Sequence, residues 1–490
     1  MLPSWLLIAL YLSIGVPALV IAFLKPAWIP VLIVVVMPMY DFDFQLGVTW
    51  SLDKIVILLI LFALPAHFAI RSRFTARLRI PATVALFLLI VALSTLASYL
   101  RLSGGSSGGF GALRGPLLRP EVEFVALLLR VAVLVVVAAL AAGKVAAFRL
   151  LKAVLFISTI VAAYGVYQFI GYYAGLPILS IYRAQAGLNN YGLFKIGSLT
   201  IFRVGSFVGE PKYAARVLFP SLLILVCSRV FPMPELKSWL TSIPVFVLHA
   251  VVFILTFATS SFFALALTIP VIAAILAVYP GRRKLSGVAS VALGIGLAAA
   301  VLVGYAGSKL SSEVVAARVT KRVGSIPPPE KAALEFLQRN PDYLLSGIGL
   351  GNASFYLRPY FDPTYHGRPL TIALHSSYLN FVLEGGIFTL VAFLAFLGAW
   401  WILGFRLLAS NKGAEFNALL ATTLLACAGL AVLNAFTPTE SSGQIWLFWG
   451  LLIALCNECR VWAEGKKPSL AQAQPAANSR SVPLEQLARG

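Results

Sequence analysis

Long apolar segments recur along the chain and constrain its fold more than any other feature. They fall near residues 4–22, 27–40, 52–70, 80–99, 122–142, 150–174, 212–231, 239–258, 260–279, 286–306, 375–404, 415–435 and 443–461. A helix needs about 20 apolar residues to cross a bilayer. Charged residues make up only 11% of the chain, well below the level of a soluble domain. The sequence therefore predicts an all-α polytopic membrane protein with about 12–13 transmembrane helices, twelve if the first two segments form one broken span.

The net charge of +20 raises the question of a nucleic-acid partner. The basic residues fall in short clusters between apolar segments and form no continuous stripe or recognition motif, so we expect no nucleic acid. All four cysteines lie in apolar segments or at their ends, and only Cys456 and Cys459 have CxxC spacing. Because this pair has no second ligand pair, we expect packing cysteines and no metal site.

Basic clusters in short loops predict the orientation, because such loops stay in the cytoplasm. Three clusters, at 71–79, 144–152 and 282–284, are all cytoplasmic if the segments alternate. The opposite, periplasmic face then receives 41–51, 100–121, 175–211, 307–374 and 436–442. The expected organisation is N-terminal transmembrane helices with short loops (1–306), a large periplasmic loop (307–374), C-terminal transmembrane helices (375–462) and a disordered cytoplasmic tail (463–490).

The large loop 307–374 is unusual in length and in charge. Its basic residues outnumber its acidic ones by eight to five, although outside loops are normally poor in positive charge. An anionic ligand on the outer face would explain this excess; chance placement in a long loop is the alternative. The apolar periodicity of 331–337 predicts that the loop is partly helical. We expect it to roof an active site, since loops of this length are usually functional or disordered.

His375 begins the apolar segment that follows this loop. A histidine at a membrane surface can act as a general base near neutral pH, and a capping or packing role is the alternative. On an uninterrupted helix Gly386 and Thr389 return close to the starting face, where a neighbouring helix could pack closely. Glu384 falls on the opposite face and is a poor candidate partner for the histidine.

Three further arginines attract notice. Arg203 stands before Gly205-Ser206-Phe207 and is either a ligand-binding cation or a side chain that snorkels to the interface. Arg130 and Arg216 lie inside apolar segments, which indicates a polar cleft or a structural pairing with a backbone carbonyl or with a carboxylate.

The glycine run 347–352 follows no predicted strand and lacks the GxGxxG spacing, so we expect no nucleotide there. It is either a turn that presents N–H groups to phosphates or a plain connection.

A family resemblance adds to these observations. The run His375-Ser376, nine residues, Gly386, two residues, Thr389 resembles the signature of O-antigen ligases and their polymerase relatives. An arginine before a Gly-Ser-Phe stretch and a large loop between late spans are also typical of that family. The specific motifs cover only about 200–216 and 307–389.

The resemblance implies a metal-independent glycosyltransferase without a cofactor, which uses an undecaprenyl or similar polyprenyl-diphosphate-linked glycan as its donor. His375 would be the catalytic base, and Arg203 with one or both of Arg318 and Arg322 would bind the diphosphate. Which loop arginine does so stays open, because prolines 327–329 disturb the family's spacing. Accessory candidates are Glu210, Arg130, Arg216, Gly386 and Thr389.

The implied function is to join lipid-linked repeat units into O-antigen or exopolysaccharide at the periplasmic face of a bacterial inner membrane. Implied partners are the donor, a glycan acceptor, the bilayer, chain-length regulators and flippases. Glu210-Pro211 favours a polymerase over a ligase that transfers finished glycan to a lipid A-core or another acceptor. A lipid-linked oligosaccharide transporter is the other alternative; such proteins tend to show internal repeats, and none is evident here.

Overall fold

The computed structural model describes residues 4–39, 43–46, 48–71, 80–102, 119–178, 193–196, 199–280, 326–361, 364–365, 368–369, 372, 374–411, 414–437 and 443–463. The expected segment 286–306, the loop residues Arg318 and Arg322, and the tail beyond 463 lie outside these residues.

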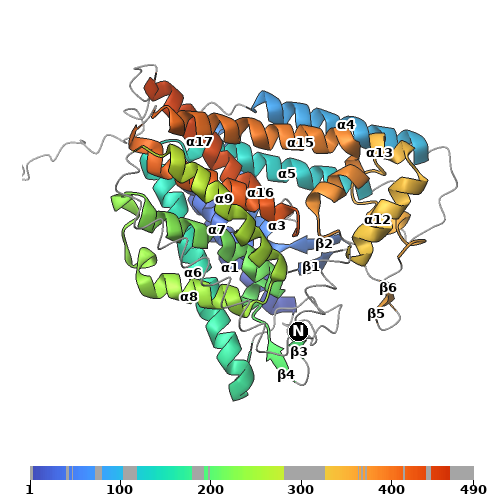
Figure 1. Cartoon of the computed structure of the whole chain (residues 1–490), viewed down its shortest axis with the longest axis horizontal. Helices are drawn as coiled ribbons and strands as arrows, with labels where there is room; N and C mark the ends of the chain where they lie inside the picture. The colour runs from blue at the N-terminus through green and yellow to red at the C-terminus, as the bar shows by residue number, and fades with distance from the viewer. Residues whose placement is uncertain are drawn as a thin grey trace, which may run out of the picture.

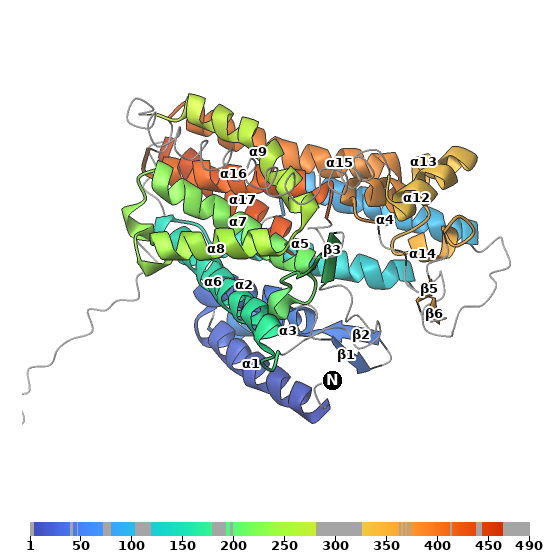
Figure 2. The ribbon, with the colours of Figure 1, turned by 60° about the horizontal axis from the view of Figure 1, so that its bottom comes forward.

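The described chain is a bundle of apolar helices (Figures 1 and 2). Before the large loop lie α1 (Ser4–Leu24), α2 (Ile29–Val36), α3 (Leu52–Arg71), α4 (Ala82–Leu102), α5 (Arg119–Leu140), α6 (Lys144–Ala174), α7 (Pro211–Val230), α8 (Ile243–Leu255) and α9 (Thr259–Val278). After it come α15 (Ser377–Ala409), α16 (Asn417–Asn434) and α17 (Gln444–Ala463). Among the described residues, 8 helices are long and apolar enough to cross a membrane, and four shorter apolar helices accompany them. The predicted all-α polytopic membrane fold is confirmed.

The remaining described elements are short. The large loop contains α12 (Pro328–Arg339), α13 (Asp342–Ser346) and α14 (Ala353–Tyr356). Three antiparallel hairpins pair β1 (Asp43–Leu46) with β2 (Val48–Ser51), β3 (Leu193–Ile196) with β4 (Leu199–Phe202), and β5 (Thr364–Tyr365) with β6 (Arg368–Pro369). Figures 1 and 2 show α12, α13, hairpin β1–β2 and hairpin β5–β6 toward the same end of the bundle.

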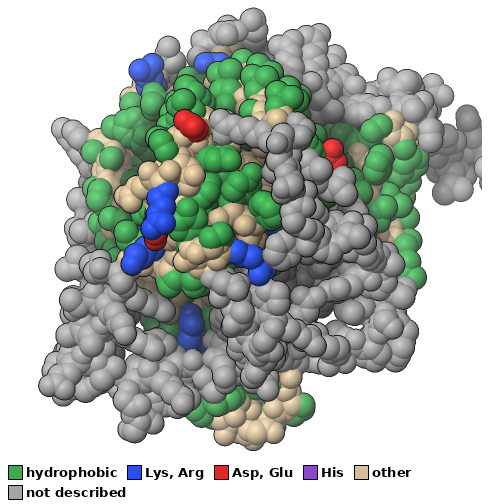
Figure 3. Space-filling model, turned by 90° about the vertical axis from the view of Figure 1, so that its right-hand side faces the viewer, with side chains coloured by type: hydrophobic (Ala, Val, Ile, Leu, Met, Phe, Trp, Pro, Cys, Tyr) green, Lys and Arg blue, Asp and Glu red, His purple; other side chains and the backbone are tan. Residues whose placement is uncertain are grey.

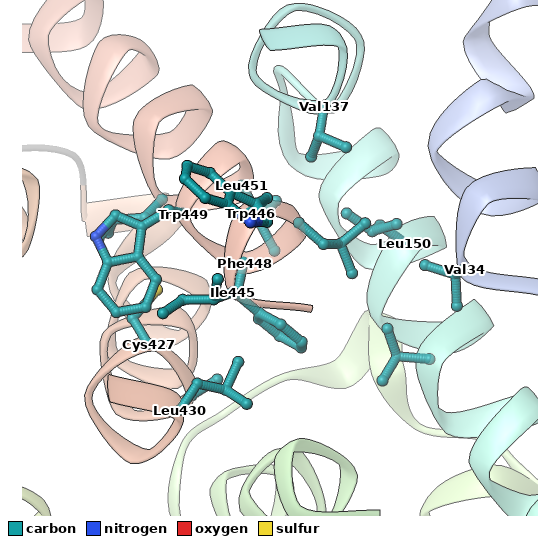
Figure 4. Close-up of a cluster of buried hydrophobic side chains, with 14 of the residues drawn as sticks. Val34, Val137, Leu150, Cys427, Leu430, Ile445, Trp446, Phe448, Trp449 and Leu451 are labelled. Carbon is teal, nitrogen blue, oxygen red and sulfur yellow. The ribbon is translucent and has the colours of Figure 1, made fainter. Parts of the chain in front are cut away.

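The centre of the bundle is built around α17. Its Trp446, Phe448 and Trp449 are buried, and their rings fill the space toward α16, α5 and α6 (Figure 4). Gly450 lets α17 approach α5 closely, because a Cβ there would lie 2.7 Å from the carbonyl oxygen of Leu134. Small residues at helix contacts allow this kind of close packing in membranes.

The helix that follows His375 is not continuous, contrary to expectation, because it is broken at Gly386. Gly386 interrupts α15 with φ 78° and ψ 171°, a conformation open essentially to glycine alone. A short first segment, Ser377 to Gly385, therefore carries the residues next to His375, and the long second segment crosses the bundle.

Candidate active site

His375 lies directly before α15 and is held by a carboxylate from the large loop. Glu330, in the first turn of α12, accepts hydrogen bonds through Oε1 from the backbone N–H of His375 and from that of Ser376, the latter at 3.4 Å. The same oxygen lies 3.2 Å from His375 Nδ1. Glu330 is buried, whereas the His375 side chain is 47% exposed. The Nδ1 edge of the imidazole is thus held by Glu330, while about half of the side chain stays exposed.

The charge of Glu330 decides which imidazole nitrogen carries the proton. Burial raises the pKa of this carboxyl, but the hydrogen bonds and the charge of His375 outweigh it, and the net pKa is lowered. An ionised carboxylate only accepts hydrogen bonds, so in a neutral histidine Nδ1 carries the proton and Nε2 carries the lone pair. Nε2 on this half-exposed side chain is then the proton acceptor, as in other carboxylate–histidine pairs.

The second oxygen of Glu330 is notable for a different reason. Oε2 is buried and has no hydrogen-bond partner among the described residues. Buried polar atoms are nearly always satisfied, and exceptions require an explanation such as a catalytic role or a bound water. This carboxylate is therefore placed for its contact with His375 at some cost to its own solvation.

The start of α15 is anchored on α16, which keeps His375 in position. Ser377 Oγ donates to Asn434 Oδ1 at 2.8 Å, and Tyr378 OH donates to the carbonyl of Ala431 at 2.6 Å. Ser376 caps the helix by accepting from the N–H of Leu379 at 3.3 Å. Because its neighbours are bonded in this way, the backbone of His375 has little freedom to move.

Arg203 is anchored at the connection between α8 and α9. Its Nε donates to the carbonyl of Thr256 at 3.0 Å and its Nη2 to that of Phe257 at 3.4 Å. Ser260, in the first turn of α9, is hydrogen bonded to Thr437 at 3.1 Å, three residues beyond the Asn434 that holds the start of α15. The start of α9, next to the segment that anchors Arg203, therefore contacts the chain just beyond α16.

The stretch after Arg203 is folded tightly against α6. Gln168, buried in α6, accepts from the N–H groups of Gly205 and Ser206 at 3.1 and 2.7 Å. Ser206 adopts a positive φ of 54° and donates through Oγ to the carbonyl of Val161 at 2.8 Å. The Gly-Ser-Phe stretch therefore has a structural role, which is to present Arg203 from a rigid loop.

The other accessory candidates lie elsewhere in the fold. Glu210 immediately precedes α7 and pairs with Lys212 at 2.9 Å. Arg216 is 2% exposed, with its guanidinium 4.6 Å from the ring centre of Tyr213. Arg130 is partly exposed in the middle of α5. Arg216 is therefore packed inside the protein, and its role as an accessory site residue stays a prediction.

Gly386 and Thr389 serve the break in α15. A Cβ at Gly386 would collide with the carbonyl of Leu345, so the element that packs closely here is the short loop helix α13. Thr389 is buried and donates to the carbonyl of Gly385 at 2.6 Å, one turn back along the chain. The expectation of small residues aligned below the histidine is corrected, because the helix is not continuous.

The glycine run 347–352 uses its N–H groups within the protein. Ile348 and Gly349 donate to the carbonyls of Leu383 and Glu384, each at 2.9 Å. Gly351 and Ala353 donate to the Glu384 carboxylate. The turn therefore donates hydrogen bonds to the carbonyls next to the break in α15 and to the Glu384 carboxylate. Its geometry does not support the alternative of a phosphate-binding turn.

Charge is mixed at the end of the bundle that carries α12 and α13 (Figure 3). Figure 3 shows this end, with Lys and Arg side chains spread among apolar and acidic ones. Of the loop's described cations, Arg339 is paired with Glu335 at 2.6 Å, and Lys331 is exposed. Within the described ranges no three His, Cys, Asp or Glu side chains are grouped so that they could hold a metal ion.

Glu330 is the site residue that sequence reasoning missed. Prolines at 327–329 and a glutamate in the first turn are recognisable features of a helix start, and they mark α12. Its pairing with a histidine 45 residues later is a tertiary contact with no local signal.

Comparison with known protein families and with curated proteins finds no match for this chain. What the site can do therefore follows from its residues and their geometry.

Proposed function

We propose that the protein is a membrane glycosyltransferase that lengthens a glycan from a polyprenyl-diphosphate-linked donor, at the periplasmic face of a bacterial inner membrane. The observation that carries the proposal is the pair of Glu330 and His375, with a half-exposed imidazole at the end of a transmembrane bundle. The resemblance of the His375–Thr389 stretch to O-antigen polymerases and ligases supports it.

In this mechanism His375 Nε2 accepts the proton of the acceptor hydroxyl. The resulting oxygen attacks the anomeric carbon of the donor sugar, and a new glycosidic C–O bond forms. The C–O bond between that carbon and the diphosphate breaks, and the electron pair leaves with the polyprenyl diphosphate. Glu330 stabilises the imidazolium that forms and holds the ring orientation, a role that carboxylates fill in related histidine sites.

The diphosphate requires cations, and arginine forks match phosphate oxygens well. Arg203 stands in a rigid loop anchored next to the start of α9, which contacts the chain just beyond α16, and this supports its role in binding the donor. Arg318 or Arg322 from the large loop is the second proposed cation.

The test is a reaction with purified protein in lipid vesicles, a polyprenyl-diphosphate-linked repeat unit as donor, and the same unit as acceptor. We expect release of polyprenyl diphosphate and glycans of increasing length, in the presence of EDTA. His375→Ala, purified at equal yield, is the matched negative control.

Other outcomes would point elsewhere. Transfer of a single preassembled glycan to an added lipid acceptor, without lengthening, would identify a ligase. Movement of the intact donor across the vesicle membrane, with no glycosidic bond formed, would identify a transporter and overturn the proposal. Loss of wild-type activity in EDTA would contradict the metal-independent mechanism.

A further inference from the structure

Helix α13 and the turn after it lie beside the transmembrane helices, at a level short of their ends. Ser94, within α4, donates to the carbonyl of Ser346 at the end of α13 at 2.7 Å. A Cβ at Gly349 would lie 2.6 Å from Ser98 Oγ, also in α4. Figures 1 and 2 show that α4 extends at least as far as α13 toward the right-hand end of the bundle, where α12 lies. This part of the loop therefore descends along the bundle.

The depth of α13 can be estimated from a contact between α15 and the first turn of α4, which we place at the opposite membrane surface. Trp400 Nε1 in α15 donates to Thr83 Oγ1 in α4 at 3.2 Å, and tryptophans gather at membrane–water interfaces. Ser94 is eleven residues from Thr83, or about 16 Å at the helical rise of 1.5 Å. Gly386 is fourteen residues from Trp400, or about 21 Å. Both distances fall short of the roughly 30 Å of a hydrocarbon core.

Near its end α13 exposes two apolar side chains, whereas Asp342 at its start is exposed and acidic. Leu344 is 41% exposed and Leu345 is 58% exposed. They lie next to the part of α4 whose Leu93 and Leu96 are exposed on a transmembrane helix. Helix α12, by contrast, exposes Lys331, Gln338 and Arg339. We propose that the C-terminal end of α13 is embedded in the outer half of the bilayer and that Leu344 and Leu345 contact the acyl chains of membrane lipids.

The hydrogen bonding of the turn agrees with such a location. Irregular backbone at membrane depth is tolerated only where the protein satisfies its polar groups. Gly347 N–H donates to the carbonyl of Tyr343 at 2.8 Å, and Ile348 and Gly349 donate to the broken end of α15. The Glu384 carboxylate takes the N–H groups of Gly351 and Ala353. These contacts leave Leu344 and Leu345 exposed next to the satisfied backbone of the turn.

The proposal does not depend on the enzymatic function and can be tested separately. The four native cysteines are free and buried, so an added surface cysteine can be spin-labelled selectively. Labels would be placed by Leu345→Cys and by two controls, Leu96→Cys on α4 and Gln338→Cys on α12, in protein reconstituted in phosphatidylcholine vesicles. Collisions of each label with oxygen, which concentrates in lipid, and with a water-soluble nickel chelate would be measured.

We expect the oxygen-to-nickel accessibility ratio at Leu345→Cys to match Leu96→Cys and to exceed Gln338→Cys several-fold. Leu344→Cys should give the same result. A ratio at both leucine positions equal to that of Gln338→Cys would show that α13 lies in water and would overturn the proposal. Exposed cysteine substitutions are mild, and size-exclusion profiles matching wild type would confirm that each variant is folded.

Discussion

Glu330 and Glu384 both carry buried carboxylates that accept hydrogen bonds from backbone N–H groups. Both are involved in the contact between the large loop and the first segment of α15. Glu330 comes from the loop and holds His375, whose imidazole is half exposed. Glu384 belongs to α15 and holds the loop, with Asn380 donating to Oε2 at 3.2 Å. Burial and amide contacts alone therefore do not distinguish a carboxylate that orients a proposed catalytic base from a structural one. The distinction is whether the group that it orients is open to a ligand.

The largest effect on activity should come from His375. We expect His375→Gln to lower turnover by about 10²–10⁴-fold, the usual loss for a general base. Donor binding and protein yield should stay near wild type, because proton transfer occurs only along the reaction path. The matched control is His67→Gln on α3, whose Nδ1 lies 2.6 Å from the carbonyl of Phe23 and which should keep full activity. Near-normal turnover of His375→Gln would remove the histidine from the mechanism.

The largest effect on stability should come from the break in α15. Gly386→Ala forces a side chain into a glycine-only conformation and against the Leu345 carbonyl. We expect a loss of at least about 2 kcal/mol, measured as a lower thermal midpoint in detergent. Gly398→Ala, in the same helix with open space around it, should be neutral or stabilising. Equal midpoints for the two variants would show that the break is not required.

Glu330→Gln separates orientation from folding. The amide can present its NH₂ group to Nδ1 and so favour the wrong tautomer of His375, and we expect turnover to fall roughly 10–100-fold. Glu335→Gln on the same helix, which removes only the exposed pair with Arg339, should have little effect. Unchanged turnover of Glu330→Gln, with the wild-type thermal midpoint, would contradict the assignment.

Glu384→Gln should lower stability and, unlike Glu330→Gln, leave activity nearly unchanged. An amide accepts through one oxygen only, so the N–H groups of Gly351 and Ala353 would lose part of their partner. We expect a loss of about 1–2 kcal/mol in unfolding free energy, with activity per folded molecule close to wild type. A loss of activity as large as that of Glu330→Gln, at equal stability, would erase the difference between the two carboxylates.

The smallest predicted effect is a pH dependence of the stability that Glu330 contributes. The pKa of Glu330 in the folded protein is lowered from its ordinary value of 4.5, because the hydrogen bonds from His375 outweigh burial. A lowered pKa stabilises the fold above the unfolded value, and this contribution is lost as the pH falls through the folded value. The difference in thermal midpoint between wild type and Glu330→Gln should therefore be largest near neutral pH and shrink below about 4.5. A midpoint difference that stays constant across this pH range would contradict the lowered pKa of Glu330.

Much of the fold was predictable because lipid solvation imposes a strong, local pattern. Twelve of the thirteen apolar segments correspond to observed helices, and the thirteenth, 286–306, lies outside the described residues. The break at Gly386 was not predicted, since glycine also occurs within continuous membrane helices. The pairing of Glu330 with His375 and the hold of Glu384 on the glycine turn were also missed. Both join residues far apart in sequence, and no periodicity or spacing records such contacts.

The position of α12 in the chain has a consequence for biogenesis. Glu330 is synthesised before His375, on a helix that is not itself a span. The two residues meet only after α15 has inserted and α16 has anchored its first residues through Asn434 and Ala431. On the proposed mechanism, a nascent chain with α15 or α16 still untranslated holds the histidine without its orienting carboxylate. Activity would thus begin only when the last helices have entered the membrane, and lipid-linked donor would be safe from premature hydrolysis until then.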